Sequence, residues 1–153
     1  MKFDPLWLVP VTREKIPLGF SKEDVIEKLD SHVEWGTFLA LELARAPSGR
    51  LVGKRLGEVY TIARSIRYQN IYQPYARFRI DPVANGSVIF LTFYAPFSIL
   101  FLLLCALLSY SAMEAVGFLA LLVFVSLIHL AGVLLFFWEK QKILRILRQT
   151  LGE

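Results

Sequence analysis

The sequence is poor in cysteine and histidine, and this shortage excludes several kinds of site. One cysteine and two histidines in 153 residues cannot form a disulfide within the chain or a cysteine-based metal site. The chain also lacks a glycine-rich phosphate loop and a serine, histidine and carboxylate set in a usable context. We therefore expect a protein that is not an enzyme and holds no metal.

Charge is almost absent from one third of the chain. Residues Ser87 to Trp138 carry one charged side chain, Glu114, whereas Met1 to Gly86 holds 13 of the 17 lysines and arginines. With 56% hydrophobic residues the chain is too apolar for an ordinary soluble domain. We expect a polar domain followed by a membrane part, with the lipid bilayer as one partner. The net charge of +4 fits a membrane-facing bias, and no basic stripe with exposed aromatics points to a nucleic acid.

A secretory signal is also missing. The first twenty residues have no continuous apolar core, and Pro5, Pro10 and Pro17 break any helix there. Basic residues precede the first apolar run and follow the second, whereas the loop between the runs has none. The positive-inside rule then places both termini on the cytoplasmic side of the membrane.

The polar part predicts one helix and several strands. Ser21 caps a helix that runs to about His32, with Phe20 packing on Val25. The stretch from Trp35 to Ala46 fits either a strand or a short helix. Strands are expected in three ranges, at Leu56 to Ile62, Ser65 to Tyr72 and Tyr75 to Ile80.

The next residues decide where the sheet stops and the membrane part begins. Asn85-Gly86 predicts a turn, so Val88 to Tyr94 pairs back on the strand from Tyr75 to Ile80. Pro96 suits the first turn of a helix, which would run to about Met113 as a first span. The rival interpretation is a single long helix that starts at Val88.

The second uncharged run, Ala115 to Trp138, is expected to continue into an amphipathic helix. That helix lies at the lipid headgroups or docks on the first domain. The predicted fold is α+β, a helix on a small antiparallel sheet, continued into a two-helix transmembrane hairpin and an amphipathic C-terminal helix. The domains are 1–95, 96–138 and 139–153.

Several short motifs carry a resemblance to a known family. The matching residues are Arg67, Tyr68, Asn70, Tyr72 and Pro74 in one box, Gly86, Thr92 and Pro96 around the last strand, and Glu139 before the last helix. From Phe20 to its end the chain resembles a widespread family of small bacterial membrane proteins of uncharacterised function. Gln69 and Ala95 depart from the family pattern, in which arginine and histidine are common. The resemblance implies the architecture above and a location in a bacterial inner (plasma) membrane with both termini cytoplasmic, and it assigns no catalytic residue.

His129 is the first candidate site residue, because a polar ring within a membrane span is costly. It is a candidate cofactor ligand, for example to a porphyrin, or a proton relay. The alternative is a neutral histidine hydrogen-bonded across a helix pair, to Ser109 or to a partner's backbone. Small residues suit close helix packing, and five are assigned to it: Ser98, Cys105, Ser109, Ser126 and Gly132.

A polar and aromatic cluster is the second candidate, for a partner protein or a lipid headgroup. Its members are Arg64, Arg67, Tyr68, Asn70, Tyr72 and Tyr75. The function predicted from these patterns is a non-enzymatic accessory or scaffold subunit that binds other integral membrane subunits. A lipid- or hydrophobic-ligand-binding domain and a cofactor-binding subunit are the alternatives.

Overall fold

A mixed six-stranded sheet with two helices forms the described part of the chain. The computed structural model describes residues 10–36, 47–67, 72–96, 98, 103, 105, 107 and 118–152. The elements are β1 (Val11–Leu18), α1 (Lys22–Asp30), β2 (Val33–Trp35), β3 (Leu51–Leu56), β4 (Val59–Arg64), β5 (Tyr75–Val83), β6 (Gly86–Tyr94) and α4 (Phe118–Leu151). The strand order is β1-β6-β5-β4-β3-β2, and only the pair β2 and β3 is parallel. The fold is α+β, with a larger and more mixed sheet than predicted.

β1 is absent from the prediction, which treats the early prolines as breakers. Pro17 nevertheless lies inside β1, an edge strand of the sheet, where a missing N–H need not remove a ladder hydrogen bond. Ile16 and Leu18 are buried in the core, whereas Arg13 and Lys15 are exposed. Buried and exposed side chains thus alternate along these residues, but only the pairing with β6 identifies the segment as a strand.

The start of α1 is confirmed. The Ser21 hydroxyl accepts a hydrogen bond from the Asp24 N–H at 3.1 Å, and the Asp24 carboxylate accepts one from the Ser21 N–H at 3.3 Å. This reciprocal pair is a capping box and satisfies two donors at the helix start. Val25 and Leu29 are fully buried, so α1 lies against the sheet through this face.

The strand predicted at Leu56 to Ile62 is confirmed as β4 from Val59 onward, but its start is wrong, and the strand predicted at Ser65 to Tyr72 is wrong over its described residues. The first range spans a tight turn between β3 and β4, where Gly57 adopts a φ of +59°. A glycine takes this left-handed conformation at little cost, and the chain reverses there. Residues 65–67 and Tyr72 lie outside any strand, and residues 68–71 lie outside the described ranges.

The hairpin of β5 and β6 is confirmed, and so is the end of its second strand. The register pairs Arg79 with Phe90 and Ile80 with Ile89. β6 ends at Tyr94, which excludes the rival helix from Val88. β-Branched and aromatic side chains favour the strand up to that point, and Pro96 follows it.

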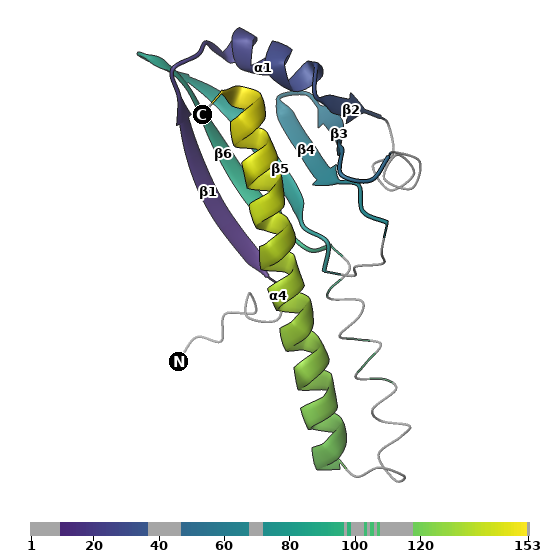
Figure 1. Cartoon of the computed structure of the whole chain (residues 1–153). Helices are drawn as coiled ribbons and strands as arrows, with labels where there is room; N and C mark the ends of the chain where they lie inside the picture. Colours follow the sequence, from purple (N-terminus) through teal and green to yellow (C-terminus); the bar gives the residue numbers. More distant parts are fainter. Residues whose placement is uncertain are drawn as a thin grey trace.

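The predicted two-helix transmembrane hairpin is wrong. Within the described ranges, α4 is the one helix long and apolar enough to cross a membrane. Of the predicted first span, Ser98, Leu103, Cys105 and Leu107 are helical, and their neighbours lie outside the described residues. The green part of α4 projects beyond the strands, and its yellow end lies beside them (Figure 1).

The C-terminal part of α4 docks on the sheet domain, one of the two predicted outcomes. Ile143, Leu147 and Leu151 are at most 1% exposed and belong to the same core as Val25 of α1. The Lys28 ammonium also donates to the Leu151 carbonyl oxygen at 3.1 Å. The predicted boundary after residue 138 therefore falls inside one continuous helix, whose end belongs to the domain core.

Candidate functional site

The point at which α4 leaves the sheet is polar and buried. The Glu139 side chain is 1% exposed and accepts hydrogen bonds from Arg64 Nε at 2.8 Å and Nη2 at 2.9 Å. Lys142 Nζ donates to the same carboxylate at 2.9 Å. Since Arg64 is the last residue of β4, this bidentate pair joins the helix to the end of that strand.

A second ion pair joins α4 to the edge strand β1. Lys140 Nζ lies 2.6 Å from Glu14 Oε1 of β1, and the lysine side chain is only 7% exposed. The same ammonium lies 5.5 Å from the centre of the Phe93 ring in β6. Adjacent residues of α4 therefore bind β4 with a negative charge and β1 with a positive one.

Below this junction, His129 of α4 contacts Tyr72. The Tyr72 hydroxyl oxygen lies 2.7 Å from His129 Nδ1, and the two rings meet edge to face with centroids 5.6 Å apart. The Tyr72 ring lies directly on Gly132, where a Cβ atom would overlap its ring carbons. Burial raises the pKa of Tyr72 to about 12, so the phenol is neutral at physiological pH.

The chemistry open to His129 depends on its tautomer. If the Tyr72 hydroxyl donates to Nδ1, the neutral ring carries its proton on Nε2 and has no lone pair there for a metal. If Nδ1–H donates to the Tyr72 oxygen, Nε2 has a lone pair in the orientation used by ligating histidines. Among the residues the structure describes, no group of three or more potential ligand side chains is placed to hold a metal ion.

The predicted polar and aromatic cluster is divided among separate contacts. Arg64 binds Glu139, and Tyr72 contacts His129. Tyr75 is 8% exposed and packs against Tyr94, with ring centroids 6.0 Å apart. Arg67 is exposed, and Tyr68 and Asn70 lie outside the described residues.

The residues predicted for helix packing also have different surroundings. Ser98 is fully buried, and its hydroxyl donates to the Ala95 carbonyl oxygen at 2.8 Å. Gly132 is covered by Tyr72, and Cys105 is a partly exposed free thiol. Ser126 is exposed, and Ser109 lies outside the described part of the chain.

The sequence patterns missed a basic surface on the face of the sheet opposite α4. It carries Arg13 and Lys15 of β1, Lys54 of β3 and Arg77 and Arg79 of β5, all exposed. The alternation at Arg77 and Arg79 indicates a solvated strand face. The full set could not be assembled from the sequence because β1 and β3 were not predicted.

No protein-family model, curated protein or solved structure matches the chain. The suggested resemblance to a family of small membrane proteins is therefore supported only in its coarse features, a mixed sheet and an apolar C-terminal helix.

Proposed function

We propose that the protein is a non-enzymatic accessory subunit, anchored in a membrane by α4, whose sheet domain holds a partner protein near the bilayer. One observation carries this proposal. α4 is a continuous helix. Most large apolar side chains of its uncharged first part are exposed, whereas Phe136 and the charged last part pack against the sheet. A membrane anchor and a folded domain are thereby joined without a flexible linker.

The uncharged part of α4 has the dimensions of an anchor. Phe118 to Trp138 contains no charge, and 21 residues of helix extend about 31 Å, close to the hydrocarbon thickness of a bilayer. Its large apolar side chains from Leu122 to Trp138 include nine that are 40% to 62% exposed. A continuous apolar surface of this length is unusual on soluble proteins and requires a cover. Trp138, at its charged end, suits the membrane interface.

The sheet and the C-terminal end of α4 must lie on one side of any membrane that α4 crosses, because they share one core. Lys140, Lys142, Arg145 and Arg148 follow the apolar part directly. An excess of lysine and arginine marks the cytoplasmic side of a span. The proposed location is therefore the cytoplasmic face of a bacterial inner membrane.

Two matched variants test the anchor. Leu127→Lys places a charge near the middle of the exposed part of α4, where the side chain is 60% exposed. A lysine at that depth costs about 2.5 to 3.5 kcal/mol of insertion free energy. Leu56→Lys makes the same change at a 72% exposed leucine at the end of β3. Leu127→Lys should move protein from the membrane fraction to the soluble or aggregated fraction, whereas Leu56→Lys should not. Equal membrane content in both variants would contradict anchoring by α4.

Purification from native membranes in a mild detergent tests the accessory role. Recovery in a fixed ratio with larger membrane proteins is expected. Recovery alone, as a homo-oligomer or a monomer, would contradict it.

The two alternatives receive unequal support. A hydrophobic-ligand site between α1 and the sheet has no supporting observation, since Val25 and Leu29 are fully buried in a packed core. Cofactor binding at His129 has one supporting observation, the contact of His129 Nδ1 with the Tyr72 hydroxyl. A chromophore that is present in the purified protein and lost in His129→Leu would favour that alternative.

A further inference from the structure

The face of the sheet turned away from α4 forms a basic surface built from five strands. Residues paired across neighbouring strands point to the same face of a sheet. The register therefore aligns one row across five strands, Lys54, Thr61, Arg77, Thr92 and Arg13. The next row pairs Arg79 with Phe90 and Phe90 with Lys15.

The charges of this surface are poorly balanced. Five cationic side chains lie on it, at Arg13, Lys15, Lys54, Arg77 and Arg79. Within the described ranges, Arg79 is the one of these five that forms an ion pair, with Asp81 at 3.1 Å. Such an excess of one sign produces a field that attracts anionic partners.

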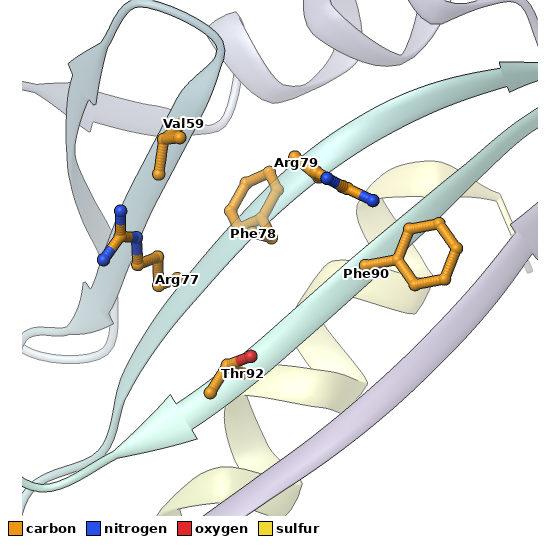
Figure 2. Close-up of a pocket in the computed structure, with 6 residues that line it drawn as sticks. All are labelled: Val59, Arg77, Phe78, Arg79, Phe90 and Thr92. Carbon is orange, nitrogen blue, oxygen red and sulfur yellow. The ribbon is translucent and has the colours of Figure 1, made fainter.

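The centre of the surface is hollowed. A depression of about 360 Å³ is lined by Val59 of β4, Arg77 to Arg79 of β5, and Phe90 and Thr92 of β6. Figure 2 shows Arg77 leaning toward β4 and Arg79 toward Phe90, so that the two guanidinium groups diverge over the strands. The depression thus offers a hydroxyl and apolar atoms between two separate carboxylate-binding groups.

We propose that this surface, the basic face, binds an acidic segment of a partner protein. The inference rests on the proposed accessory function and names the surface that this function would use. Arginine binds carboxylates in a bidentate manner and is enriched at protein interfaces. The side chains of Lys15 and Arg79 are exposed, so carboxylates can approach them from solvent.

A nucleic acid fits the basic face less well. Single-stranded nucleic acids are bound by stacking bases on open aromatic rings. Phe90 is the exposed aromatic residue of the depression, but Lys15 Nζ and the Arg79 guanidinium carbon each lie 5.5 Å from its ring centre. A base would have to displace these cations before it could stack.

Lipid headgroups also fit less well. Phe90 lies four residues before Tyr94, the end of β6, which corresponds to about 13 Å along the strand. The strands run alongside α4, so the basic face is parallel to the helix axis (Figure 1). The apolar part of α4 projects from one end of the domain, and the basic face is not at that end. A flat bilayer surface crossed by α4 would meet that end, not the face.

Binding of a labelled poly-L-glutamate peptide to the full-length protein in nanodiscs of uncharged lipid tests the inference. Arg77→Gln with Arg79→Gln should weaken binding about tenfold, because two exposed charge pairs contribute about 0.7 kcal/mol each. Arg67→Gln with Arg145→Gln removes the same charge from exposed positions off this face and should change binding less than twofold. All four arginines are exposed, and unchanged thermal unfolding of both variants checks that folding is intact.

Each other outcome overturns the inference. Equal losses in both double variants would mean general charge attraction. Tighter binding of poly(U), or of vesicles containing phosphatidylglycerol, that depends on Arg77 and Arg79 would assign the face to a nucleic acid or to lipid. Absence of binding to any probe would remove the face as an anion site.

Co-purification from native membranes separates this inference from the proposed function. If the double variant Arg77→Gln with Arg79→Gln retains the partner in an unchanged ratio, the accessory function is supported and binding through the basic face is contradicted. Binding of poly-L-glutamate by a protein that purifies alone would support the face and contradict the accessory function.

Discussion

Replacement of Glu139 by glutamine should loosen α4 from the sheet. The Glu139 carboxylate is 1% exposed, and the Arg64 side chain that it binds is 13% exposed. Removal of one charge from a buried pair costs about 3 to 5 kcal/mol, because the remaining charge stays away from water. Arg64 retains some water contact and glutamine still accepts one hydrogen bond, so we expect the lower end, about 3 kcal/mol. This loss is more than a hundredfold in the unfolding equilibrium.

The control for this variant is Glu58→Gln. Glu58 binds Lys22 at 2.9 Å, but its side chain is 84% exposed, so water replaces the lost partner. Urea unfolding of both variants in detergent, followed by circular dichroism, measures the difference. Glu139→Gln should lower the midpoint clearly and Glu58→Gln should leave it unchanged. Equal midpoints would refute the view that the junction of Arg64 and Glu139 secures the helix.

Three further predictions concern Gly132, Tyr72 and Trp138, which lie on α4 or against it. Gly132→Ala should destabilise the protein by about 1 to 3 kcal/mol because its Cβ overlaps the Tyr72 ring, while Gly19→Ala, at an open position, should not; thermal unfolding measures both. The Tyr72 pKa rises from 10.0 to about 12 on folding, so its stabilising effect is complete below pH 10 and is lost as the pH rises through about 12. Between pH 10 and pH 12, Tyr72→Phe should therefore lose less unfolding free energy than the wild type, which pH-dependent unfolding measures. Equal losses in the two proteins would contradict the raised pKa of Tyr72. Trp138, 54% exposed, should be quenched by lipids labelled near the headgroup more than by lipids labelled at the chain end.

Local signals predicted the parts of the fold that depend on neighbouring residues. The capping box at Ser21, the turn at Gly86 and the end of β6 before Pro96 all follow from residues a few positions apart. β3 pairs with the next strand, β4, but Gly53, Lys54 and Arg55 interrupt its apolar pattern. β1 is interrupted by Pro17, and its partner β6 lies far along the chain. Propensity does not report such pairings.

The contacts of the candidate sites were beyond sequence patterns for the same reason. Tyr72 and His129 are 57 positions apart, and Arg64 and Glu139 are 75 positions apart. His129 was identified as a polar ring in an apolar run, which is a local observation. Its partner comes from a loop that precedes β5, and only the packing of α4 on that loop brings the two together.

The continuity of α4 couples the orientation of the sheet domain to the orientation of the apolar end of the helix. The helix is 34 residues long, about 51 Å, and contains no proline. Its one glycine, Gly132, is braced by the Tyr72 ring. A change in bilayer thickness alters the tilt of a spanning helix. The C-terminal part of α4 is fixed to the sheet through Glu139 and Lys140. With α4 in a membrane as proposed, such a tilt would therefore reorient the whole domain and the basic face.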